Sequence, residues 1–242
     1  MPFVFIFVGV LALAGPAEAQ SISIDMGSAG GEGALSARII QLFLLVTVLS
    51  LAPGIAMMVT CFPFMVTVLS ILRQAIGVQQ APPNMLIVSL ALFLTYFVMQ
   101  PVFSKAWDTG LSPLMNGDIT EIQAMENTLG PFEEFMSARV DEDTLAMLTE
   151  IAPERTEPGE APAFSILVPA FMLSEIARAF EIGFLVFLPF LIIDMVVASI
   201  LMSMGMMMVP PVVVSLPFKL AFFVLADGWS LIAGALVRGY AT

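Results

Sequence analysis

Residues 182–194 read Ile-Gly-Phe-Leu-Val-Phe-Leu-Pro-Phe-Leu-Ile-Ile-Asp, and this stretch decides the class of fold. The uncharged apolar run before Asp194 is typical of a helix that lies in or against a membrane. Proline lacks an N–H and clashes with the preceding turn, so we expect each proline in such a run to mark a kink or a helix end. The piece Ile182–Ile193 measures only about 18 Å as a helix, and so does Gln41–Ala52. Neither could cross a hydrocarbon core of about 30 Å alone, so we expect much of this surface to pack against other subunits.

Apolar stretches make up most of the chain. Hydrophobic residues account for 59% of its 242 residues and charged residues for 12%, whereas about 25% is usual in a soluble domain. A soluble domain of this composition would expose large apolar patches, and a disordered chain needs low hydrophobicity, so both classes are excluded. The net charge of −12 argues against a nucleic-acid partner, because no basic face is available to hold phosphates.

The residue counts also argue against an enzyme. The chain has no histidine, which removes the commonest general base and metal ligand. Its one cysteine, Cys61, allows neither an intrachain disulfide nor a structural zinc site and is most simply a small buried residue. No Gly-rich phosphate loop and no G-x-S-x-G motif is present. We therefore expect no catalytic residue, no metal and no cofactor.

The N-terminal residues resemble a secretory signal. Residues 3–13 form a short apolar run, and the small-x-small triplet 17–19 follows Gly15-Pro16. Cleavage after Ala19 would leave residues 20–35 as a flexible mature N-terminus. The alternative is an uncleaved first anchor, although the run is shorter than the roughly 20 residues that a span needs.

Charge divides the remainder into three segments. Residues 36–104 and 164–242 are apolar and are each expected to form a proline-kinked helical hairpin. Between them, residues 105–163 carry thirteen acidic and three basic side chains and are expected to be extramembrane. A cleaved signal followed by two spans would place this acidic region in the periplasm, where few Lys or Arg are expected.

The acidic region contains two amphipathic stretches, over residues 119–137 and 140–151. Apolar residues recur in each stretch at intervals of three or four, which predicts helices with one buried face. In the first stretch these positions are Ile119, Ile122, Met125, Leu129, Phe132 and Phe135.

The densest unusual segment lies at residues 202–211 and reads Met-Ser-Met-Gly-Met-Met-Met-Val-Pro-Pro. Methionine is unbranched and polarizable and therefore repacks around varying shapes. Gly205 gives the backbone freedom, and Pro210 and Pro211 end the segment rigidly. A ring of such segments around a symmetry axis would form a deformable apolar seal. The alternative is a helix end whose methionines fill a core or face lipid.

Ionisable residues within the apolar segments are a second candidate site. Glu175, Arg178 and Glu181 follow one another at intervals of three and lie on roughly one helical face. Asp194 stands alone in an apolar run, and Lys219 is the only cation between Arg178 and the C-terminal arginine. Such groups are costly in a membrane and are paired or face a cavity. We favour structural ion pairing over a proton or ion path, because a relay needs a chain of titratable groups.

Several stretches resemble the FliP family of type III export gates, over about residues 36–238. The matching stretches are Leu69–Gly77, Pro82–Asn84, Leu90–Thr95, Pro189–Asp194, Met204–Pro211, Leu216–Leu220 and Asp227–Trp229. The resemblance implies an all-α, multi-pass protein of the bacterial inner membrane, in the flagellar basal body, that assembles into a ring. It also implies a pentamer that joins FliQ-like and FliR-like subunits, with FlhA-like and FlhB-like export components and unfolded flagellar proteins as partners.

In that family the methionine-rich loop is regarded as a gasket, which corresponds here to Met204, Gly205, Met206, Met207 and Met208. The sequence departs from the family pattern at Pro63-Phe64, Met85, Ala177, Arg178 and Glu181, which puts any inherited ion pair near Glu175 in doubt. The injectisome SctR branch is similar but usually lacks a signal peptide. Two other functions remain open: a single-chain ion or small-molecule transporter, and a membrane scaffold without a pore.

Overall fold

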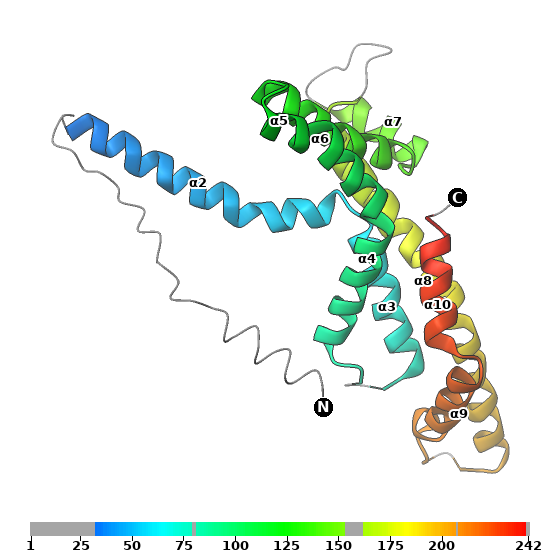
Figure 1. Ribbon diagram of the computed structural model, residues 1–242. Helices are drawn as coiled ribbons and strands as arrows, with labels where there is room; N and C mark the ends of the chain where they lie inside the picture. Colours follow the sequence, from blue (N-terminus) through cyan, green and yellow to red (C-terminus); the bar gives the residue numbers. More distant parts are fainter. Residues whose placement is uncertain (1–31, 79–80, 153–161, 207, 241–242) are drawn as a thin grey trace, which may run out of the picture. The chain divides into compact units, whose positions relative to one another are not determined.

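The computed structural model describes residues 32–78, 81–152, 162–206 and 208–240, and within these ranges the chain is helical without any strand. Its elements are α2 (Glu32–Met58), α3 (Phe62–Ile76), α4 (Asn84–Ala106), the π-helical turn η1 (Trp107–Leu111), α5 (Ser112–Asn116), α6 (Glu121–Ser137), α7 (Glu142–Ile151), α8 (Phe164–Ser203), α9 (Pro211–Leu225) and α10 (Gly228–Arg238) (Figure 1). The expected all-α fold is confirmed. The expected signal, residues 1–19, lies outside the described residues, as does most of the expected flexible segment 20–35.

The chain divides into two compact units, residues 1–50 and residues 51–242. The described part of the first unit is helix α2 up to Ser50, and its side chains from Ile39 onward are all exposed. An apolar helix without a buried face needs lipid or another protein to cover it.

Most helices continue through their prolines. Prolines lie inside α2 (Pro53), α4 (Pro101), α6 (Pro131), α8 (Pro169 and Pro189) and α9 (Pro217). The expectation of separate 12-residue pieces is therefore wrong: Gln41–Ala52 lies within the 27 residues of α2, and Ile182–Ile193 within the 40 residues of α8. A proline costs one N–H and bends the helix. Ending the helix would leave four N–H and four C=O groups without partners, which is worse in apolar surroundings.

The uninterrupted helices are long enough to cross a membrane. Three segments qualify by length and composition among the described residues: Ile39–Met58, Asn84–Asn116 and Phe164–Ser203. Helices α9 and α10, of 15 and 11 residues, are each too short and qualify only as a pair, with a bend of 61° between them. The bend lies at Asp227, whose φ of 48° is left-handed, and at Gly228, where a Cβ atom would stand 2.1 Å from the Phe223 ring.

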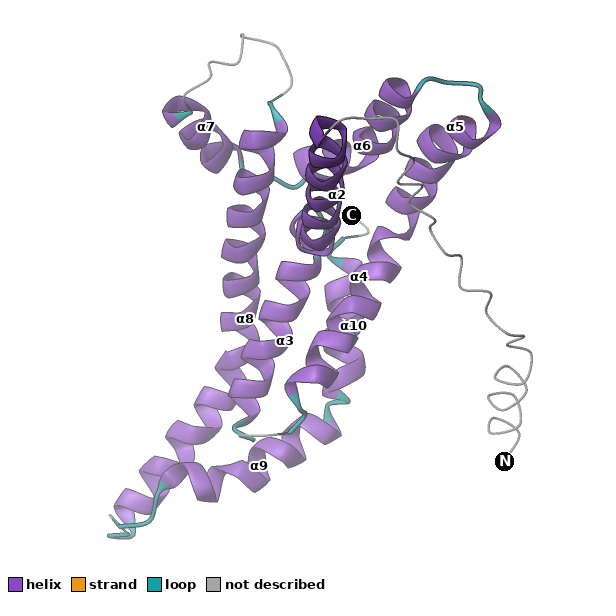
Figure 2. Cartoon of the chain, turned by 90° about the vertical axis from the view of Figure 1, so that its left-hand side faces the viewer, coloured by secondary structure: helices purple, strands orange, loops and turns teal. Residues whose placement is uncertain are grey.

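The core of the second unit forms where α3 packs along α8 (Figure 2). One face of α3 is buried, and Met65, Val68 and Leu72 have no exposed surface. Gly183 lets α8 approach α3 closely, since a Cβ there would lie 2.3 Å from Cδ1 of Ile71. Cys61, at the start of α3, is fully buried as expected. Helix α9 packs against α8, and α10 contacts α4 and α9.

Helices α6 and α7 confirm the two helices expected at 119–137 and 140–151. The expected buried face of α6 is wrong for Ile122, Met125 and Leu129, which are exposed. Helix α6 packs on η1 through small residues instead. A Cβ on Gly110 would lie 2.1 Å from Oγ1 of Thr128, so the two backbones approach too closely for a row of large side chains between them.

Candidate functional site

The segment between α8 and α9, residues 204–210, is called the methionine loop here. Helix α8 ends in a Schellman motif: the N–H of Gly205 donates to the Met202 carbonyl at 3.1 Å, and the N–H of Met206 donates to the Leu201 carbonyl at 3.0 Å. The φ of Gly205 is +72°, which favours glycine because it has no Cβ. Pro210 then caps α9, and Pro211 is its first helical residue, where the missing N–H costs nothing. The sequence thus fixes the two ends of the loop.

The methionine loop presents its side chains outward on this chain. Met204, Met206 and Met208 are 63%, 45% and 97% exposed. Met207 lies outside the described residues. The described methionines of the loop therefore do not fill the core of their own chain, and their surface is free to meet lipid or other molecules.

Asp194 and Lys219 form an ion pair between α8 and α9. The Lys219 Nζ atom lies 2.5 Å from Oδ2 of Asp194 and also donates to the Ala75 carbonyl at 3.1 Å. The Ser215 hydroxyl donates to Oδ1 of Asp194 at 2.5 Å. Lys219 is almost completely buried, and its ammonium finds two acceptors from two different helices. The pair joins the two helices that flank the methionine loop.

Glu175 is the centre of a second cluster, and its side chain has no exposed surface. The Nε atom of Arg139 donates to Oε1 of Glu175 at 3.1 Å, and Nη1 of Arg178 lies 3.4 Å from the same oxygen. The Tyr240 hydroxyl donates to the other oxygen, Oε2. Arg139 also lies over the Tyr240 ring, 3.7 Å from its centre. The cluster links the end of α6, helix α8 and the end of α10.

Of the predicted ionisable residues, all but Glu181 belong to one of the two clusters. The structure brings Glu175 to Arg178 and Asp194 to Lys219, while Glu181 forms no salt bridge within the described part of the chain. Arg139 and Tyr240 were not predicted as members of this cluster. Each lies at least 36 residues from Glu175 along the chain, and no spacing rule connects residues that far apart.

The surroundings of Tyr240 and Cys61 do not favour catalysis by either side chain. Burial raises the pKa of the Tyr240 hydroxyl, so it remains a hydrogen-bond donor at any ordinary pH. Burial also raises the pKa of the Cys61 thiol to about 12, which keeps it from acting as a thiolate nucleophile. Among the described residues, no three His, Cys, Asp or Glu side chains lie together as metal ligands.

Comparisons with known proteins identify the family. The FliP family model matches residues 45–236. A flagellar biosynthetic protein FliP of Caulobacter vibrioides is 52% identical over 93% of this chain and 84% of its own. Those of Agrobacterium fabrum and Rhizobium meliloti are 49% and 47% identical over 96% and 98% of both chains. With its apolar helices long enough to span a membrane, the chain is thus a non-enzymatic flagellar biosynthesis and export protein of the membrane, and it belongs to the FliP family.

Proposed function

We propose that this chain is a channel-forming subunit of the flagellar export gate, which passes unfolded flagellar proteins across the inner membrane. The methionine loop is proposed as the seal of the pore. The observation that carries the proposal is the exposure of Met204, Met206 and Met208 at the tip between α8 and α9. A loop that faced only water would not expose three large apolar side chains together.

The loop has the properties that a deformable seal needs. Its ends are fixed by the Schellman motif at Gly205 and by Pro210, so the loop returns to one place when nothing passes. The methionine side chains between these ends have three rotatable bonds each and can adapt to a varying substrate surface. Several loops that meet at one axis would exclude ions at rest and separate when a chain enters.

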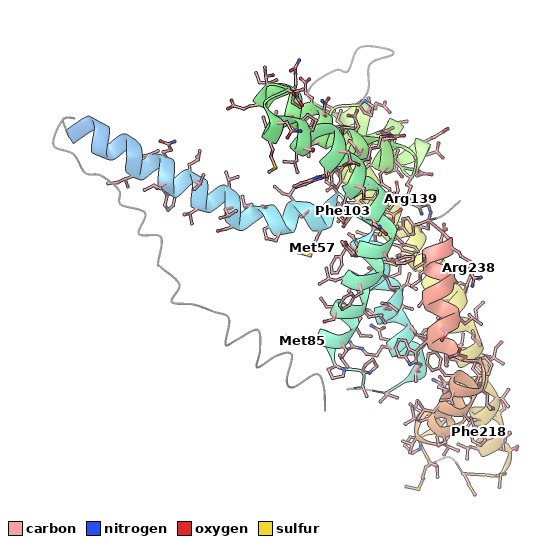
Figure 3. All side chains as sticks on the ribbon, in the orientation of Figure 1. Met57, Met85, Phe103, Arg139, Phe218 and Arg238 are labelled. Carbon is pink, nitrogen blue, oxygen red and sulfur yellow. The ribbon has the colours of Figure 1, made fainter. Side chains whose placement is uncertain are left out.

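The ring itself is part of the proposal. Exposed apolar side chains cover α2 and parts of α4 and α8, which supports burial against further copies and partner subunits (Figure 3). We propose a pentamer with FliQ-like and FliR-like subunits, served by FlhA-like and FlhB-like export components. The proposed segments are a signal at 1–19, a flexible stretch at 20–35, hairpins at 36–104 and 164–242, and a periplasmic acidic region at 105–163.

The ion pairs have a structural role in this proposal. The bond between Asp194 and Lys219 holds α8 and α9 together behind the methionine loop, so that the loop projects from a rigid base. Glu175 holds the acidic region against α8 through Arg139 and the end of the chain after α10 through Tyr240, while Arg178 supports Glu175 from within α8. Glu181 is exposed on the single chain and is available to another subunit.

The seal is tested by replacing Met206, Met207 and Met208 together with alanine. We expect resting cells to leak ions and to grow slowly, because alanine leaves a gap where the methionines met. The matched control replaces three exposed methionines outside the loop, Met85, Met115 and Met125, and should not leak. Normal ion retention in the loop variant, with the complex intact, would exclude the seal.

The ring is tested separately by native mass spectrometry of the detergent-extracted protein, alone and co-expressed with its small membrane partners. A pentamer that grows when the partners are added supports the gate. A stable monomer under both conditions would remove the ring and the seal together and would favour a single-chain transporter.

A further inference from the structure

A cavity of about 150 Å³ lies beside the Glu175 cluster, between α3, α8 and α10. Its walls are apolar and include Ile182 and Val186 from α8 and Leu231 and Ala235 from α10. Two charged side chains also line it, Arg139 and Arg178. These are two of the eight basic residues of the whole chain, and no acidic residue lines the cavity with them.

The two arginines that line the cavity share one carboxylate. One carboxylate, Glu175, accepts from both guanidiniums, and Tyr240 contributes a neutral hydroxyl, so these direct contacts balance one of the two positive charges. Arg178 donates only to Glu175 among the described residues, at a long 3.4 Å, so most of its five N–H donors remain for another acceptor. Two further acidic groups lie nearby but do not line the cavity: Glu181, which is exposed on α8 and makes no salt bridge within the described residues, and Asp141, whose carboxylate accepts from Thr144.

The position of the cavity along α8 matches a membrane boundary. Ser203, the last residue of α8, comes 25 residues after Arg178, which is about 38 Å along a helix. This length covers a hydrocarbon core of about 30 Å and reaches the adjacent headgroup layer. The Nη1 atom of Arg139, a residue of the acidic region, donates to the Gly239 carbonyl at the end of α10 at 3.3 Å. The cavity therefore lies where the apolar helices meet the acidic region.

We propose that this cavity binds the phosphate headgroup of an anionic phospholipid, with Arg178 and Arg139 as its donors. Arginine holds a phosphate oxygen pair through parallel N–H bonds, and the apolar walls would accept the start of the acyl chains. A free phosphate ion has no use for such walls, which favours a lipid. The bound lipid would supply the anionic acceptor that Glu175 alone does not provide for two guanidiniums.

The test measures lipid retention by the purified assembly, delipidated and then mixed with phosphatidylglycerol or phosphatidylcholine, by native mass spectrometry. We expect phosphatidylglycerol to be retained in preference. Arg178→Gln should weaken its retention at least about tenfold, the usual effect of losing a hydrogen bond to a charged group. The matched control is Arg238→Gln, because Arg238 is an exposed arginine at the same end of α10 whose Nε donates to Gly234 and which does not line the cavity (Figure 3).

A second variant tests the contribution of the cavity's shape without changing its charge. Ala235→Phe keeps both arginines and fills the space between the walls, and it should reduce phosphatidylglycerol retention as much as Arg178→Gln. Equal retention of the two lipids, equal losses in the Arg178 and Arg238 variants, or competition by inorganic phosphate would each overturn the assignment to a lipid headgroup. The readout is lipid retention rather than export, so the result stands whether or not the proposed seal holds.

Discussion

The Nζ atom of Lys219 lies 2.5 Å from Oδ2 of Asp194, so that a single ion pair joins the helices on the two sides of the methionine loop. The two side chains are 25 residues apart along the chain and are brought together because α9 folds back on α8. Lys219 is 4% exposed, so removal of Asp194 would leave an ammonium with little access to water, whereas the Asp194 side chain is 28% exposed.

The first prediction concerns this pair. Asp194→Leu leaves the buried Lys219 ammonium with the Ala75 carbonyl as its one remaining acceptor among the described residues, and we expect it to cost about 3–5 kcal/mol of unfolding free energy, with a smaller loss for Lys219→Met. Lys219→Met combined with Asp194→Leu should recover part of that loss, because an apolar pair needs no partner. The measurement is thermal unfolding of the extracted assembly for the two single variants and the double variant. Additive losses in the double variant would show that the two groups act independently.

Tyr240 allows a conservative test of the Glu175 cluster. Tyr240→Phe removes the hydroxyl that donates to Oε2 of Glu175 but keeps the ring, which packs edge-on against Phe64 with centroids 5.3 Å apart. We expect a loss of about 1.5–3 kcal/mol, as for other hydrogen bonds to a charged group. Tyr96→Phe is the control, since Tyr96 is 63% exposed. Equal unfolding temperatures for the two variants would contradict the role of the hydroxyl.

The acidic region offers a prediction about pH. The Asp141 carboxylate caps α7 and accepts from the Thr144 N–H at 2.9 Å and from its hydroxyl at 2.8 Å. These bonds, chiefly that from the hydroxyl, lower the pKa of Asp141 below 3.8. Because the folded pKa is the lower one, the cap stabilises α7 fully above 3.8 and loses this contribution as the pH falls through the folded value. Asp141→Ala should therefore speed amide exchange at Thr144 more at pH 6 than at pH 2.5. An equal effect at both values would contradict this account.

The local features of this fold could be predicted from the sequence. The intervals of three and four apolar residues placed α6 and α7 correctly, because each helix is a short segment with its own capping residue, Thr120 or Asp141. The burial of Cys61 followed from its chemistry. Gly205 and Pro210, which the sequence marks as special backbone positions, stand at the end of α8 and at the cap of α9.

The features that were missed depend on distant parts of the chain. Pro189 was expected to end or kink a short helix. In the apolar surroundings of α8, a continued helix costs less free energy than two helix ends with unpaired backbone groups. The exposure of Ile122 could not be predicted, because it follows from the close approach of α6 to Gly110. The bond between Arg139 and Glu175 joins residues 36 positions apart, and only the folded chain shows it.

The close approach at Gly110 gives the fourth prediction. Gly110→Ala would place a Cβ 2.9 Å from the Ala124 carbonyl oxygen and 2.9 Å from the Thr128 backbone nitrogen, so α6 must move away from η1. We expect a loss of about 1–3 kcal/mol, as for other overpacked sites. Gly130→Ala is the matched control in α6, because nothing lies within 4 Å of its Cβ, and alanine should stabilise the helix by up to about 1 kcal/mol. Thermal unfolding of both variants checks the opposite signs.

The last prediction concerns the backbone of the methionine loop. Gly205 has open space around its Cβ position, so only its φ of +72° opposes a side chain there. An alanine in the left-handed region costs about 1–2 kcal/mol, whereas asparagine visits this region readily. If the Schellman turn sets where the methionines stand, Gly205→Ala should impair swimming and let resting cells leak, and Gly205→Asn should be close to normal. Leak and motility that are normal in both variants would show that the seal does not depend on this turn. Equal impairment in both would instead mean that the site rejects any side chain, since the left-handed backbone penalises alanine more than asparagine.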